Sequence, residues 1–65
     1  MISIPKPPCT ISPEEHPYFE KGFRSGSIPR YPFTPRPYWT GNQLEAYAVG
    51  FDLGMDALAD TMSAN

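Results

Sequence analysis

The side chains that could do chemistry are few in this 65-residue chain, and they are not spaced for catalysis. His16 is the single histidine and directly precedes Pro17, a setting typical of a helix lead-in rather than of a general base. Cys9 is the single cysteine, and beyond Lys6 it has no neighbour that would stabilise a thiolate, so an inert thiol is expected. A hydrolase needs a nucleophile together with an orienting base. The sequence therefore predicts a protein that is not an enzyme.

The carboxylates are equally poor candidates for acid–base or metal chemistry. Glu14 and Glu15 are adjacent, and adjacent residues of a helix do not face one another. Asp52, Asp56 and Asp60 recur once per helical turn, which is typical of a solvated helix face. One histidine and one cysteine cannot assemble a zinc cluster. We therefore expect no catalytic residue, no metal and no cofactor, which leaves a function exerted by contact.

Length and composition predict a single domain with a thin core. A domain of this size buries only about 60% of the surface that its unfolded chain exposes, and small domains without disulfides or metals usually gain stability by association. We expect association with a larger protein or with a second copy of the chain as a homodimer. Apolar runs fall short of the roughly 20 residues of a membrane span, and the first residues lack the apolar segment of a secretory signal. A cytoplasmic protein with no membrane partner is therefore expected.

Two segments of the chain repeat one another. Residues 19–26 and residues 47–54 share the pattern aromatic-x-x-Gly-Phe-x-x-Gly. A glycine inside a helix costs about 1 kcal/mol relative to alanine, so glycines on helical spacing require a compensating close approach. We predict that two helices pack through these glycines, which are Gly22, Gly26, Gly50 and Gly54.

The elements that carry these glycines can be bounded from caps and prolines. We predict a mainly α fold of the helix–linker–helix type, with helices over about 17–26 and 42–62, an extended or disordered arm over 1–11, and a single small helical domain over 12–65. Residues 12–16 form a lead-in turn, because Pro17 cannot donate a backbone hydrogen bond within a helix begun at residue 13. Capping boxes are predicted at Ser12 with Glu15 and at Thr40 with Gln43, with Asn42 and Glu45 as a second option for the latter helix.

The linker over 27–41 is rich in prolines and aromatic residues. Pro29, Pro32 and Pro35 recur every third residue, the period of a polyproline II helix. Such a segment is either a ligand for a peptide-binding groove or a stiff connection whose aromatic rings fold over the helices. The second interpretation is favoured because the rings are unfavourable in water. In either case the expected protein-binding anchors are Tyr31, Phe33, Tyr38 and Trp39.

The second helix is amphipathic. Its broad apolar face is predicted to comprise Leu44, Tyr47, Ala48, Phe51, Met55, Leu58 and Met62. Val49 and Leu53 fall beyond the small residues of this helix, toward the acidic side. If the first helix alone packs on the second, Val49 and Leu53 are partly exposed, so they are further candidates for a partner-facing surface.

The chain resembles the ribosome modulation factor family of small bacterial proteins over about residues 18–54. The first helix has Gly-Phe-Arg-Ser-Gly at 22–26, the linker has Tyr-Pro-Phe at 31–33, and the second helix has Tyr-Ala-Val-Gly-Phe at 47–51. The order of these elements is that of the family. The resemblance implies two short helices joined by a linker, and it implies the ribosome or its RNA as a partner.

The charge distribution separates the two possible partners. All basic residues precede position 37, whereas residues 42–65 carry acids alone, and the net charge is −2. Proteins that bind phosphate backbones normally carry a strong basic excess. We therefore favour a larger protein partner, bound through the aromatic and proline-rich surface and the acidic helix. The alternative is RNA or the ribosome, bound through Lys21, Arg24, Arg30 and Arg36.

Overall fold

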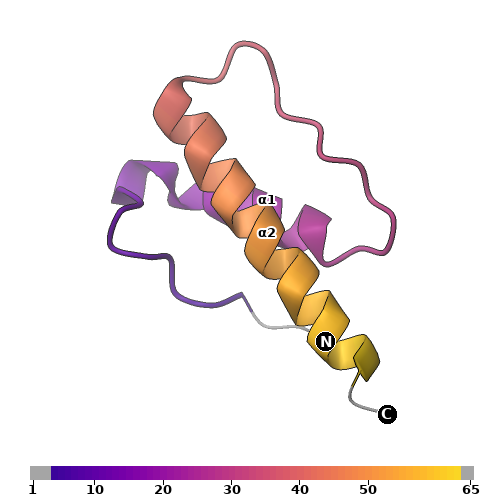
Figure 1. The fold of residues 1–65 in the computed structure, drawn as a ribbon. Coiled ribbons are helices and arrows are strands. Elements are labelled where there is room, and N and C mark those ends of the chain that lie inside the picture. Colours follow the sequence, from indigo (N-terminus) through magenta and orange to yellow (C-terminus); the bar gives the residue numbers. More distant parts are fainter. Residues whose placement is uncertain (1–3, 64–65) are drawn as a thin grey trace.

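The molecule consists of two packed helices and a long connection between them (Figure 1). The structure, a computed structural model, describes residues 4–63. It contains a 3-10 turn (η1, Pro13–Glu15) and the helices α1 (His16–Gly26) and α2 (Gly41–Ser63), with no strand among the described residues. The helix–linker–helix fold is confirmed, and each helix end lies within one residue of its predicted position. Residues 1–3 of the predicted arm and residues 64–65 of the predicted domain lie outside the described residues.

Neither helix, within this described part of the chain, is both long and apolar enough to cross a bilayer.

The two predicted capping boxes have different outcomes. At α2, the Thr40 N–H donates to Gln43 Oε1 (3.0 Å) and the Gln43 N–H donates to Thr40 Oγ1 (3.3 Å), so this box forms. At η1, the Ser12 side chain makes no capping bond. In a capping box the Ser12 hydroxyl would accept a hydrogen bond from the Glu15 N–H. Here that N–H already donates to the Ser12 carbonyl (2.9 Å) in the 3-10 turn. The box at Ser12 is therefore replaced by a backbone bond.

The helices α1 and α2 cross with their chains running in the same sense. Gly22 lies against the Tyr47 carbonyl, and Gly26, one turn further along α1, lies against the Phe51 carbonyl, one turn further along α2. The same pattern recurs with the helices exchanged, because Gly50 faces the carbonyl of residue 19 and Gly54 that of residue 23. A Cβ atom at any of the four glycines would lie closer than 3.0 Å to the backbone of the other helix. The repeated segments thus pack on one another about an approximate twofold axis.

This shared direction accounts for the length of the linker. Helices that run in the same sense leave the end of α1 and the start of α2 at opposite ends of the pair, so residues 27–40 must travel back alongside them (Figure 1). A polyproline-like segment advances about 3.1 Å per residue and is stiff. The prolines therefore give the linker the reach that this topology requires.

The core extends into the N-terminal arm. Ile11 is buried with Phe19 and Ala46, and Ile4 packs against this cluster. A turn that is closed by the Ile11 N–H donating to the Pro8 carbonyl (3.0 Å) directs Ile11 inward. The predicted arm, placed outside the helical domain by the sequence analysis, thus covers one side of α2.

Candidate functional site

Two of the four linker aromatics anchor the linker on the helices. The Phe33 ring lies 5.4 Å from the Tyr47 ring and 5.2 Å from the Phe51 ring, between centroids. The Trp39 ring lies 4.9 Å from that of Tyr47 and 5.4 Å, edge to face, from that of Tyr18. These spacings are those of favourable aromatic pairs. The expectation that linker rings fold over the helices holds for Phe33 and Trp39, although Phe33 as a whole remains 48% exposed.

Tyr38 has the opposite environment. It is 78% exposed, the most of any large apolar side chain among the described residues. It lies in a turn over residues 36–39, closed by the Trp39 N–H donating to the Arg36 carbonyl (3.2 Å). Because Trp39 is packed on the helices and Pro37 restricts the backbone, the backbone of the turn is held in place and the Tyr38 ring extends into solvent, with Arg36 exposed on the same turn.

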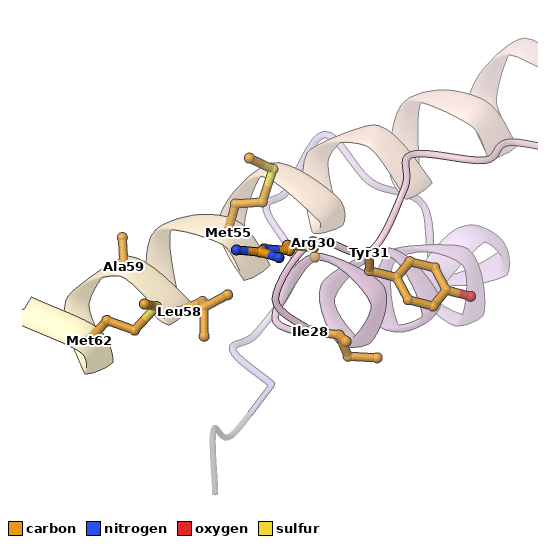
Figure 2. A pocket seen from close by; sticks show the side chains of 8 residues that line it. Ile28, Arg30, Tyr31, Met55, Leu58, Ala59 and Met62 are labelled. Carbon is orange, nitrogen blue, oxygen red and sulfur yellow. The ribbon is translucent and has the colours of Figure 1, made fainter.

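Tyr31 belongs to a second surface feature, an open groove beside the C-terminal half of α2. The groove has a volume of about 240 Å³. Figure 2 shows Arg30, on the turn that follows α1, reaching toward Met55 of α2, and Ile28 and Tyr31 on the same turn also line the groove. The complete lining is Gly26, Ile28, Arg30, Tyr31, Met55, Leu58, Ala59 and Met62.

The groove exists because only part of the predicted apolar face of α2 is buried. Tyr47 and Phe51 are buried, but Met55 is 52% and Met62 65% exposed. Leu44, at the other end of the helix, is 40% exposed. The reason is length: α1 has 11 residues and α2 has 23, so α1 covers only part of the longer helix (Figure 1).

Val49 and Leu53, predicted as partner-facing, have a different position. Both are half-buried and pack against the cluster of Ile11, Phe19 and Ala46. The arm therefore takes the side of α2 that a two-helix arrangement would leave open. These two residues contribute to the core and do not join the exposed linker aromatics.

The cations of the RNA alternative lie on three separate segments. Lys21 and Arg24 are exposed on α1, Arg30 lies on the turn at the groove, and Arg36 on the turn of Tyr38. The Lys21 ammonium lies 5.7 Å from the centre of the Trp39 ring, a cation–π contact. On α2 the acids Glu45, Asp52, Asp56 and Asp60 are all exposed.

The chemically reactive side chains are dispersed. Cys9 is an exposed free thiol, and His16 is half-buried at the first position of α1. Among residues 4–62 no group of three or more histidine, cysteine, aspartate or glutamate side chains is placed to hold a metal ion. What the described surface offers is contact area: the Tyr38 turn on one side and the groove along α2 on another.

No protein-family model matches the chain, and neither does any curated protein or solved structure with which it was compared. The resemblance to ribosome modulation factors consequently stays a prediction based on short motifs.

Proposed function

We propose that this chain is a small, non-catalytic accessory protein that acts in the cytoplasm by binding a larger protein partner and altering its activity or assembly. The observation that carries the proposal is Tyr38, 78% exposed on a turn that Trp39 anchors to the helices. Tyrosine and arginine dominate the energetics of protein interfaces, and Arg36 belongs to the same turn.

The fixed position of the turn is what makes it suitable for binding. Ordering a flexible segment on association opposes binding by about 0.5–1.5 kcal/mol for each mobile side chain. The packing of Trp39 and the restriction by Pro37 order the backbone of this turn in the free protein, so the side chains that must be ordered on binding are only those exposed on the turn. The half-exposed ring of Phe33 extends the apolar surface along the linker.

The acidic row on α2 supports a protein partner over a nucleic acid. Glu45, Asp52, Asp56 and Asp60 are exposed, and α2 contains no basic residue. A phosphate backbone near this helix would be repelled, whereas a protein with a basic patch would be attracted and oriented.

The proposal is tested by crosslinking from the turn. A photoreactive phenylalanine at position 38 should capture one protein in saturable fashion in the cells that make the chain, and the same group at exposed Glu20 on α1 serves as the matched control. The captured protein is then purified and its affinity for the wild-type chain and for Tyr38→Ala is measured by titration calorimetry. A central interface residue contributes about 2 kcal/mol or more, so Tyr38→Ala should bind roughly 30-fold more weakly.

Equal affinity of the Tyr38→Ala and wild-type chains would show that the turn is not the interface. Capture of RNA or of ribosomal proteins, with binding that weakens steeply as salt rises, would replace this proposal with the RNA alternative. A contact anchored by aromatic residues should change little over the same range of salt.

A further inference from the structure

One face of α2 is left without a partner inside the molecule. The helix α1 contacts α2 through Gly50 and Gly54, the arm covers the side of Val49 and Leu53, and Phe33 covers Tyr47 and Phe51. The remaining apolar side chains line a strip along the helix that is exposed at Leu44, Met55, Ala59 and Met62. This strip includes the groove of Figure 2.

The spacing of this strip matches a coiled-coil seam. Starting from Leu44, apolar residues follow at alternating intervals of four and three, a heptad pattern in which position a is 48, 55 and 62 and position d is 44, 51 and 58. Ala, Met and Met occupy a, and Leu, Phe and Leu occupy d. Phe33 covers Phe51, so the part of the seam that is open to a second helix runs from Met55 to Met62, with Leu44 exposed separately near the start of α2. Over this open part, a seam with this period fits the same seam of a second parallel helix, with each side chain inserted between four residues of the partner.

The charges flanking the seam select the direction of the second helix. On the g side of the seam, Gly54 packs on α1 and the groove leads to Arg30. On the opposite, e side lie Glu45 and Asp52, with Asp56 next to them. An antiparallel pair of identical helices brings e against e and would place the two acidic rows together. A parallel pair brings g against e, so that Arg30 of each copy meets the acidic row of the other.

We propose that the chain forms a parallel homodimer through the seam of α2, in which Met55 and Leu58 of each copy insert into the groove of the other. The groove volume of about 240 Å³ is below the range of roughly 300–1,000 Å³ that is usual for small-molecule pockets, and it suits inserted side chains. The dimer goes beyond the proposed function: Tyr38 does not line the groove, so a dimer would present two Tyr38 turns.

The first measurement is the mass of the wild-type chain by multi-angle light scattering at concentrations from about 1 µM to about 1 mM, which brackets weak and moderate affinities. The mass should rise from one chain to two. Met62→Glu places a charge in the seam, at a position that is 65% exposed and therefore contributes little to the fold. This variant should remain monomeric and keep the helical circular dichroism spectrum of the wild-type chain. A wild-type chain that stays monomeric throughout would overturn the proposal.

The direction of the pair is tested by disulfide trapping in a Cys9→Ser background, which removes the exposed native thiol. In a parallel pair the two copies of position 55 face each other, whereas the two copies of position 56 point to opposite sides. Met55→Cys should therefore crosslink in a glutathione buffer far more than the matched control Asp56→Cys. Equal crosslinking of the two variants, or a dimer by light scattering without the Met55→Cys crosslink, would contradict the parallel seam.

The charge pairing supplies an independent test. Arg30→Glu should weaken dimerisation, measured as a shift of the midpoint concentration, and adding Asp52→Arg with Asp56→Arg should restore it. Arg36→Glu makes the same change of charge away from the groove and should leave the midpoint concentration unchanged. If Arg30→Glu and Arg36→Glu have the same effect, general charge and not the groove governs association. These readouts need no partner protein, so their failure is separable from that of the proposed function.

Discussion

Arg30 has a backbone conformation that its residue type disfavours. Its φ angle is 63°, and it is the only non-glycine residue with positive φ in the described part of the chain. It is the third residue of a turn closed by the Tyr31 N–H donating to the Ile28 carbonyl (3.1 Å). Pro29, the second residue, is fixed at negative φ, so the turn is of type II, which normally has glycine at its third position. The turn directs the guanidinium toward α2 (Figure 2), where the proposed dimer uses it.

Arg30→Gly should therefore stabilise the fold. A left-handed conformation costs an L residue about 1–2 kcal/mol, while glycine loses about 0.5–1 kcal/mol more backbone entropy on folding than alanine does. The net expectation is a gain of about 0.5–1 kcal/mol in the free energy of unfolding, measured by thermal denaturation at low concentration. Arg30→Ala removes the same side chain and keeps the disfavoured backbone, so a gain in this control equal to that of Arg30→Gly would assign the effect to the arginine side chain instead.

Single residues show where sequence reasoning stops. Proline every third residue predicted a stiff linker with its rings over the helices, and Phe33 and Trp39 pack in this way. The sequence offered no way to separate Tyr38 from its neighbour, because two adjacent aromatics on an irregular segment have no periodicity to assign them to faces. The available signal was Pro37, whose fixed φ favours a turn at this point. For Arg30, Pro29 at the second position of a turn was the corresponding signal.

At the scale of the elements, the helices were predictable and their mutual direction was not. Thr40 with Gln43 marks the start of α2, and Pro17 separates the lead-in turn from α1, so the bounds follow from local chemistry. The Gly-x-x-x-Gly spacing predicts close approach, but a glycine strip accommodates helices in either direction. The long linker was the one feature that favoured the same direction, since antiparallel neighbours need only a short connection.

The close contact between α1 and α2 predicts that replacing a glycine with alanine destabilises the fold at the contact and not elsewhere in the helices. Gly22→Ala and Gly50→Ala would each place a Cβ atom against the backbone of the other helix, which cannot move aside as a side chain can. We expect each to reduce the free energy of unfolding by about 1–3 kcal/mol, despite the higher helix propensity of alanine. Chemical denaturation followed by circular dichroism measures this.

Gly41→Ala is the matched control for this pair. Gly41 is also helical, at the first position of α2, and a Cβ atom there would meet nothing within 4 Å. Its replacement should be neutral or slightly stabilising. If all three alanine variants behave alike, the close approach of α1 and α2 does not explain the glycines.

At the scale of the whole molecule, the small core depends on parts that carry no regular secondary structure. The arm supplies Ile11 and Ile4, and the linker supplies Phe33 and Trp39, around a pair of helices that alone would leave much of α2 exposed. The arm could not be predicted as part of the core because its prolines interrupt any regular element whose period would assign the isoleucines to a buried face. For the same reason Val49 and Leu53 were expected to face a partner.

The packing of the arm on the helices predicts that Ile11 contributes strongly to stability. Ile11 is 6% exposed and Ile28 is 48% exposed, so replacing each with alanine compares a buried with an exposed isoleucine. Removing a buried isoleucine side chain costs about 2–5 kcal/mol, whereas an exposed one costs well under about 1 kcal/mol. A domain of this length has a free energy of unfolding of about 3–10 kcal/mol, so Ile11→Ala should remove a large fraction of it.

Urea denaturation measures the free energy of unfolding of both variants. The protein concentration is kept below the range in which the proposed dimer forms, so that association does not contribute. Ile28→Ala should retain the wild-type midpoint, and Ile11→Ala should unfold at much lower urea or be partly unfolded in its absence. An Ile11→Ala chain as stable as Ile28→Ala would mean that the arm only rests on the surface. In that case Val49 and Leu53 would again be available to a partner, as the sequence first indicated, because the contact that half-buries them would contribute nothing to the fold.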